Sequence, residues 1–179
     1  MSARSWRRPE PLDPDHALSE FSCGRPELDD WLRRRAMANQ VSGAARTHVV
    51  VGGGRVIGYY ALATAAVAKS NVGSRTHRIM PDSIPAVILA RMAVDDTYRG
   101  SGLGSALLQS AVETTLAATR TIGIACLIVH ARDEDARNFY LHFDFEPSPT
   151  DPLHLILRLA DADRMNPALP VPQMSTAMP

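Results

Sequence analysis

The residues with the clearest chemical potential lie between Val87 and Gly104. An apolar, strand-like run ends at Asp95 and Asp96, and it is followed by the turn Arg99-Gly100-Ser101-Gly102-Leu103-Gly104 and then by a helical pattern. Backbone N–H groups at the start of a helix are free, and the helix dipole favours negative charge there. Glycine lets a ligand approach the backbone closely. The pattern therefore fits a phosphate-binding turn and a plain tight connection equally well.

Two common phosphate-binding motifs do not fit this turn. The phosphate loop of nucleotidases ends in Gly-Lys-Ser/Thr, and the turn contains no lysine. The dinucleotide fingerprint G-x-G-x-x-G has a different spacing and belongs to a βαβ unit near the start of a domain. The pattern that does fit is Arg/Gln-x-x-Gly-x-Gly/Ala, with Arg99, Gly102 and Gly104 at its defined positions.

Length and composition are those of an ordinary globular domain. The chain has 179 residues, of which 45% are apolar and 21% are charged, so we expect one domain. A formal net charge of zero argues against a protein that coats nucleic acid by bulk charge. Cys23 and Cys126 form neither a disulfide framework nor a metal cluster, and no apolar run has membrane-spanning length. We therefore expect a cytoplasmic protein with no metal site.

Hydrophobic periodicity predicts a mixed α/β sheet domain over residues 1–161, followed by a flexible tail over 162–179. The lead-in over 1–15 is predicted to be extended, and 65–84 to be a loop or a short helix. Helices are expected over 25–39, 102–120 and 133–142. Strands are expected over 47–51, 55–64, 85–94, 124–130, 143–146 and 154–159.

Two motifs in the expected order resemble the GCN5-related N-acetyltransferase (GNAT) superfamily. The turn from Arg99 to Gly104 looks like its acetyl-coenzyme A pyrophosphate loop, and Ala136, Phe139-Tyr140 and 143–145 look like its A-x-x-F-Y-x-x-x-G-F segment. Asp144 replaces the usual glycine, and a left-handed turn tolerates Asp less well than Gly. The resemblance covers residues 17–160. It implies the GNAT fold, a mostly antiparallel sheet of six to seven strands that is splayed at its central strand and flanked by helices.

The resemblance also implies a site for acetyl-coenzyme A. Tyr140 would be the general acid near the thioester sulfur, although a core aromatic residue is the alternative. Asp133 stands where many members have asparagine, and no Glu or His stands at a motif position as a dedicated base. The implied cofactor-binding residues are the strand backbone of Met92, Ala93 and Val94, and the loop residues Arg99, Gly100, Ser101, Gly102, Leu103, Gly104 and Ser105.

Shorter segments resemble the acetyltransferase toxins of bacterial toxin–antitoxin modules. These segments are Phe21-x-Cys23-Gly24, Leu28-Asp29-x-Trp31-Leu32 and the run from Leu89 to Asp95. Such toxins acetylate the amino acid on charged transfer RNA and so stop translation. The resemblance implies aminoacyl-tRNA as substrate and a small DNA-binding antitoxin as partner, and we expect a homodimer. The alternatives are an acetyltransferase for a protein N-terminus or a small amine, and a non-catalytic coenzyme A-binding regulator.

Arginines are the candidate contacts to RNA. Alternation along the strand predicts that Leu89, Arg91 and Ala93 share one face. Because an arginine in an apolar strand is costly unless it is paired or at the rim of a site, Arg91 is expected either to face an acceptor phosphate or to pair with an acid such as Asp95 or Glu113.

A second group of arginines ends the first predicted helix. Arg33 and Arg34 are candidates for RNA contact, and a solvated face stabilised by the helix dipole is the alternative.

Overall fold

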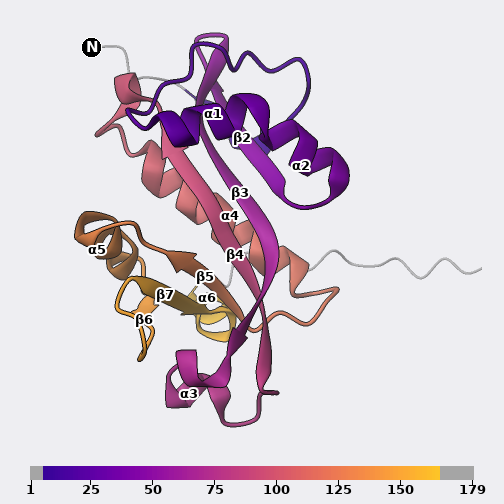
Figure 1. Cartoon of the computed structure of the whole chain (residues 1–179), viewed down its shortest axis with the longest axis vertical. Helices are drawn as coiled ribbons and strands as arrows, with labels where there is room; N and C mark the ends of the chain where they lie inside the picture. Colours follow the sequence, from indigo (N-terminus) through magenta and orange to yellow (C-terminus); the bar gives the residue numbers. More distant parts are fainter. Residues whose placement is uncertain (1–5, 166–179) are drawn as a thin grey trace, which may run out of the picture.

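Residues 6–165 are described by the structure, a computed structural model (Figure 1). Seven strands form one sheet in the order β1-β2-β3-β4-β5-β7-β6, in which only β4 and β5 pair in parallel. The predicted mixed, mostly antiparallel sheet is therefore confirmed. The strands are β1 (Glu10–Pro11), β2 (Arg46–Gly52), β3 (Arg55–Ala68), β4 (Ser83–Val94), β5 (Cys126–His130), β6 (Glu146–Pro147) and β7 (His154–Arg158). The α-helices are α1 (Pro26–Arg34), α2 (Ala36–Ser42), α3 (Ser74–His77), α4 (Leu103–Ala118), α5 (Glu134–His142) and α6 (Leu159–Met165).

The longest pairing in the sheet joins β3 to β4. The β2–β3 hairpin turns at Gly53 and Gly54, whose φ angles of 60° and 79° suit glycine. The strand β3 then continues to Ala68, beyond the predicted end at residue 64, and α3 caps the far end of the β3–β4 pair (Figure 1). The helices and the other strands are arranged around this long pair of strands.

The first predicted helix is two helices, so the single helix expected over 25–39 is wrong. The helix is interrupted at Arg35, where φ widens to −118° while ψ stays near the helical value at −31°. Leu32 before the break and Ala36 after it are both fully buried, in a cluster that contains Phe21 and Tyr59. Packing of both residues on the sheet therefore outweighs the continuous helical pattern.

The C-terminal part also differs from the prediction. A strand was expected over 143–146, but β6 contains only Glu146 and Pro147 because Asp144 turns the chain with a φ of 65°. The tail was expected from residue 162, but α6 runs to Met165 and Ala162 is buried in the main core. The rest of the predicted tail, 166–179, lies outside the described residues.

A β-bulge at Ala90 changes which side chains share a face of β4. The pairing with β3 shifts by one residue there, which leaves Ala90 as an extra residue. Leu89 packs in the core cluster beneath α4, whereas Ala93 packs in the cluster beneath α1, and Arg91 lies over a ring of α1. The prediction that Leu89, Arg91 and Ala93 share one face is therefore wrong, because the bulge reverses the alternation.

Helices cover both faces of the sheet. The helices α1 and α2 lie over one face at the end where β2 and β3 form their hairpin, and α4 crosses the opposite face (Figure 1). Among residues 6–165, no helix has the length and apolar character needed to cross a membrane. The layers leave one edge of β4 open between α1 and α5, and the candidate site lies there.

Candidate active site

The strands β4 and β5 separate halfway along β4. They pair only at Ala86, Val87 and Ile88, so β4 has no neighbour on that side from Leu89 to Val94. The separation opens a cleft of about 700 Å³. The predicted splay at the central strand is therefore present, and it exposes the backbone of the strand that leads into the glycine-rich turn.

The cleft brings together much of the predicted site. Its walls include Tyr140 from α5, the β4 segment from Leu89 to Val94 and the Arg99 side chain, and they also include Arg25 from the start of α1. The loop residues 100–105 continue from Arg99 into α4 but do not line this cavity, and neither do Arg33 and Arg34.

Two backbone positions of β4 direct their polar groups into the cleft. The Asp95 N–H donates to the Ile57 carbonyl at 2.9 Å. This bond shows which residues of β4 direct their backbone groups towards β3. By alternation, the backbone groups of Ala93 bond to β3, and those of Met92 and Val94 point to the open side. Three residues of this strand were predicted to offer free backbone groups. Met92 and Val94 do so, whereas Ala93 does not because its backbone bonds to β3. Such fixed donors can bind the amide of a pantetheine arm or a developing oxyanion.

Tyr140 is held by α5, whose start is defined by Asp133. The Asp133 carboxylate accepts a hydrogen bond from the Ala136 N–H at 2.9 Å and so caps the helix that was predicted to begin there. The Tyr140 ring is 7% exposed and packs on Phe139 and Phe145. Within residues 6–165 its hydroxyl bonds to no other group, and burial raises its pKa to about 12 against a smaller opposing effect of Arg25. Tyr140 is therefore protonated at neutral pH and has a proton to donate into the cleft.

The glycine-rich turn presents free N–H groups at the start of α4. Gly100 and Gly102 have φ angles of 69° and 86°, which only glycine adopts without strain. Gly102 is the N-cap and brings no capping side chain, and the first helical bond runs from the Ala106 N–H to its carbonyl at 3.1 Å. The N–H groups of the residues between them, including Gly104, have no helical acceptor. This helix start can bind an anion, as the sequence predicts.

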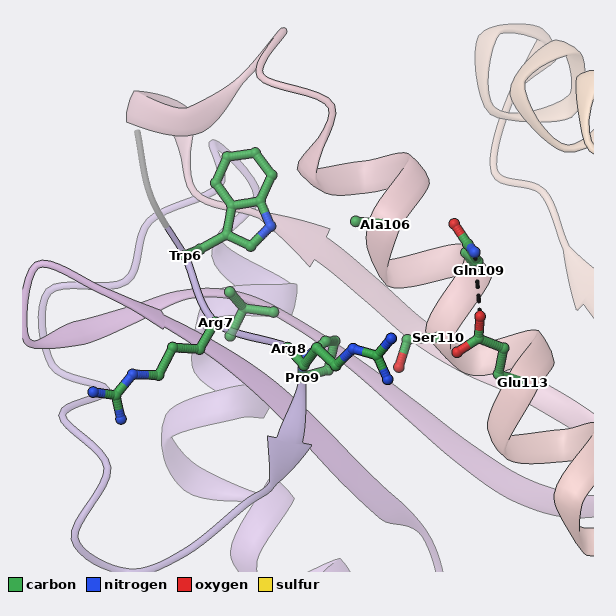
Figure 2. A pocket seen from close by; sticks show the side chains of 9 residues that line it. Trp6, Arg7, Arg8, Pro9, Ala106, Gln109, Ser110 and Glu113 are labelled. Atoms are coloured by element: carbon green, nitrogen blue, oxygen red, sulfur yellow. Dashed lines mark hydrogen bonds between the residues drawn. The ribbon is translucent and has the colours of Figure 1, made fainter. Parts of the chain in front are cut away.

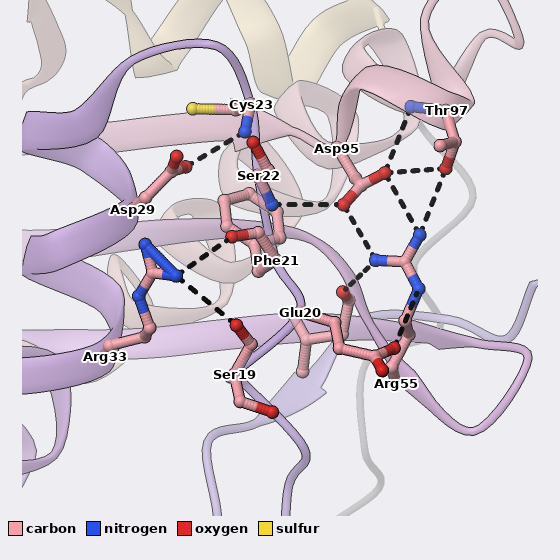
Figure 3. A network of polar contacts seen from close by, with 11 residues as sticks. Ser19, Glu20, Phe21, Ser22, Cys23, Asp29, Arg33, Arg55, Asp95 and Thr97 are labelled. Atoms are coloured by element: carbon pink, nitrogen blue, oxygen red, sulfur yellow. Dashed lines mark hydrogen bonds and ion pairs between the residues drawn. The ribbon is translucent and has the colours of Figure 1, made fainter.

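The base of the turn is anchored by a polar network around Asp95 (Figure 3). The Asp95 carboxylate accepts hydrogen bonds from the Arg55 guanidinium at 2.7 and 3.1 Å, from the N–H and hydroxyl of Thr97, and from the Ser22 N–H. Burial alone would raise the pKa of this carboxyl group, but the hydrogen bonds from Arg55, Thr97 and Ser22 outweigh it and hold the pKa well below its usual range. Asp95 is therefore ionised at all working pH values.

Arg99 connects the turn to the loop before α1. Its Nη2 lies 2.6 Å from the Asp96 carboxylate and donates to the Cys23 carbonyl at 2.7 Å. Its side chain nevertheless remains 65% exposed. A Cβ on Gly24 would come within 2.8 Å of the Arg99 guanidinium, so glycine at position 24 makes room for this contact. The guanidinium is thus positioned at the rim of the cleft while part of it stays open to solvent.

The other candidate arginines have different surroundings. Arg91 pairs with neither predicted acid, because Asp95 bonds to Arg55 and Glu113 accepts from a glutamine of its own helix. Arg33 donates to the carbonyls of the loop before α1 at 3.3 and 3.4 Å, so it has a structural role there. Arg34 is exposed.

Sequence reasoning missed the contribution of Arg25 and Arg55. Arg25 reaches from the start of α1 to within 3.8 Å of Asp133, at the start of the helix that carries Tyr140. Arg55 lies 40 residues before its partner Asp95. The sequence offered a signal only for Arg55, a charge at the start of a mostly apolar stretch, and that signal does not identify a partner.

A second hollow lies between the N-terminal segment and α4, and it lacks the features of a reaction site. It measures about 320 Å³, and Arg8 extends along it towards Ser110 while Gln109 bonds to Glu113 (Figure 2). Neither Tyr140 nor the glycine-rich turn reaches it. The candidate active site is therefore the cleft between β4 and β5.

Known proteins resemble this chain in sequence and in architecture. The family model described as acetyltransferase (GNAT) domain matches residues 43–147. A "tRNA-acetylating toxin" of Mycobacterium tuberculosis is 47% identical over 157 residues, which are 88% of this chain and 95% of the relative.

Solved structures agree with the family model. AtaT in complex with acetyl-methionyl-tRNAfMet is 25% identical and has a TM-score of 0.84, with 90% of this chain and 99% of that chain covered. A mutant AtaT toxin bound to the C-terminus of the antitoxin AtaR and to acetyl-CoA shares the fold, with 24% identity, a TM-score of 0.76 and coverage of 90% and 97%. The splayed sheet, the glycine-rich helix start and these matches together establish that the chain belongs to the GNAT family of acetyltransferases.

Proposed function

We propose that this acetyltransferase is a toxin that transfers the acetyl group of acetyl-coenzyme A to the α-amino group of aminoacyl-tRNA and thereby blocks translation. The observation that carries the proposal is the 47% identity to a tRNA-acetylating toxin over nearly its whole length. The cleft supports it, because the protonated Tyr140 lines the same cavity as the free backbone of β4.

The donor side of the proposed reaction uses the β4 strand, the turn and Tyr140. The N–H groups at the start of α4, beside Gly102 and Gly104, bind the pyrophosphate, with Arg99 at the rim. Met92 and Val94 hold the pantetheine arm and the thioester carbonyl. The acceptor amine attacks that carbonyl, the C–S bond breaks, and Tyr140 gives its proton to the departing thiolate.

The acceptor side needs no strong base in this proposal. An ester at the neighbouring carboxyl withdraws electrons from the α-amine, so much of the amine is already neutral near pH 7. Glu27 and His130 line the cleft, but neither stands at a motif position as a dedicated base. An aminoacyl ester, whose amine needs little activation, therefore suits this proposal. Arg91 contacts the 3′ end of the tRNA from the wall of the cleft, and the exposed Arg34, with Arg33 beside it, contacts phosphates further along.

The proposed partners follow from the same relatives. AtaT has been solved with the C-terminus of the antitoxin AtaR, so we assign to this chain a small DNA-binding antitoxin that neutralises it. We also propose a homodimer, and a cytoplasmic site of action because charged tRNA is found there.

Expression in a bacterium tests this function. The wild-type protein should arrest growth within one generation of induction and the Tyr140→Phe variant, expressed at the same level, should not. A harmless wild-type protein would contradict the toxin assignment. If purified protein then acetylates a protein N-terminus or a polyamine, the small-amine alternative is supported instead. If it binds acetyl-coenzyme A and acetylates nothing, it is a non-catalytic regulator.

A further inference from the structure

The guanidinium of Arg91 lies over a stacked aromatic pair beside the cleft. The Trp31 ring lies nearly parallel to the Tyr59 ring, with the centroids 5.9 Å apart and an interplanar angle of 11°. The Arg91 Cζ lies over the Trp31 ring, 5.3 Å from its centroid. Arg91 lines the cleft, whereas Trp31 and Tyr59 do not. Of these three groups, the Arg91 guanidinium is therefore the one that adjoins the open cavity.

Both ends of this stack are held in place. Tyr59 is fully buried, and its hydroxyl donates to the Leu28 carbonyl at 2.9 Å. Arg91 Nη1 donates to the Ala90 carbonyl at 2.9 Å. That acceptor belongs to the bulge residue, which has no partner in the pairing of β3 with β4. The position of the guanidinium is thus defined before any ligand arrives.

Arg91 lacks a neutralising partner within residues 6–165. No carboxylate forms an ion pair with it. The two acids that the sequence suggested as partners, Asp95 and Glu113, bond to other side chains. A half-buried cation without an ion pair is unfavourable unless a ligand compensates for the lost hydration. The Arg91 side chain lines the cleft, whose wall also carries Arg25, Glu27 and Arg99.

We propose that the guanidinium plane of Arg91, where it lines the cleft, stacks on the 3′-terminal nucleobase of the acceptor tRNA. The inference rests on the proposed function, because an aminoacyl-tRNA carries a planar base on the ribose to which the amino acid is attached. Proteins that recognise single-stranded RNA ends stack splayed bases on aromatic rings and guanidinium planes. Because the ribose joins the base to the aminoacyl group, stacking on Arg91 positions the α-amine at the cleft.

Two acylated RNA hairpins test the proposal. Both carry the same acceptor stem and the same amino acid, chosen from those that the enzyme acetylates on tRNA, and they differ only in a terminal adenosine or a terminal ribose without a base. The kcat/KM of acetylation is measured on each for the wild type, Arg91→Lys and Arg91→Gln. Lysine keeps the charge and removes the plane. Arg35→Lys, an exposed arginine outside the cleft, is the matched control, and acetyl-coenzyme A affinity verifies that each variant is folded.

Stacking predicts a loss that depends on the base. On the adenosine hairpin both Arg91 variants should lose roughly tenfold in kcat/KM, while on the base-free hairpin they should match the wild type. The wild type itself should prefer the adenosine hairpin by a similar factor. Equal losses on both hairpins, with lysine better than glutamine, would mean a phosphate contact and would overturn stacking, as would the absence of any loss. If the wild type acetylates neither hairpin nor whole charged tRNA, the proposed function itself fails.

Discussion

The Arg55 guanidinium and the Asp95 carboxylate form two hydrogen bonds, of 2.7 and 3.1 Å, between the start of β3 and the end of β4 (Figure 3). Asp95 also accepts from Ser22 and Thr97, so the loop before α1 and the start of the glycine-rich turn meet at one buried carboxylate. The turn therefore leaves the sheet from a point that is fixed by charge-assisted bonds.

Replacement of Asp95 should damage both stability and donor binding. Asp95→Asn removes the negative charge beside Arg55, and we expect a loss of about 2 kcal/mol in the free energy of unfolding. The affinity for acetyl-coenzyme A should fall as well, because the turn loses its anchor. Urea unfolding and calorimetric titration measure the two effects, with the exposed Asp82→Asn as control. Unchanged stability and affinity would show that the network does not anchor the turn.

The same carboxylate should make stability depend on pH in acid. Since the pKa of Asp95 in the folded protein lies below its unfolded value of about 3.9, its contribution is complete above that pH. The contribution is lost as the pH falls through the folded value. Urea unfolding at a series of pH values should therefore show a steeper acid decline for the wild type than for Asp95→Asn. Parallel curves would contradict the assignment.

Tyr140→Phe should affect the chemical step and not donor binding. We expect kcat to fall by a factor of about 10² to 10⁴, with the dissociation constant of acetyl-coenzyme A unchanged, because the ring packing on Phe145 is kept. Burial raises the pKa of Tyr140 to about 12, so the wild type should also show no alkaline decline in kcat up to about pH 10. An alkaline limb near neutral pH that disappears in Tyr140→Phe would contradict the raised pKa, and an unchanged kcat in Tyr140→Phe would contradict the general-acid role.

Two glycines of the turn should respond in opposite ways to alanine. Gly102 has a φ of 86°, so Gly102→Ala should destabilise the protein by about 1 kcal/mol. A Cβ on Gly104 would make only an ordinary contact, 3.8 Å from Val94, and Gly104→Ala should stabilise the helix by up to about 1 kcal/mol. Gly104→Ala should leave acetyl-coenzyme A binding nearly unchanged, because the motif accepts glycine or alanine at this position, whereas Gly102→Ala should weaken binding by distorting the turn. Thermal unfolding and titration separate these outcomes, and equal effects of the two variants on binding would contradict the assignment of the turn.

Asp144 should be a place where the fold can be improved without a change in activity. Its φ of 65° is the only positive value for a non-glycine residue in the described chain, and the related motif has glycine there. Asp144→Gly should raise the free energy of unfolding by about 0.5–1 kcal/mol. Thermal unfolding measures the gain and a steady-state assay confirms an unchanged kcat. A lower melting temperature would mean that the Asp144 carboxylate makes a stabilising contact.

Local features of this site could be predicted from the sequence, and contacts between distant segments could not. The cap at Asp133 and the helix start after Gly102 depend on residues within one turn of each other, so residue type and spacing were sufficient. The bulge at Ala90 depends on register with β3, and the Arg55–Asp95 pair depends on which strands are neighbours. For the same reason the break at Arg35 was missed, because it follows from packing on the sheet and not from helix propensity.

Acetylation of charged tRNA by the purified protein is the most direct test of the proposed function. Bulk aminoacyl-tRNA is incubated with acetyl-coenzyme A labelled in the acetyl group, and the RNA is digested to its terminal nucleosides for mass spectrometry. We predict that the aminoacyl-adenosine of one or a few amino acids gains the mass of an acetyl group on its α-amine, and that Tyr140→Phe abolishes the gain. Unlabelled RNA, under conditions in which the protein acetylates another amine, would contradict the assignment.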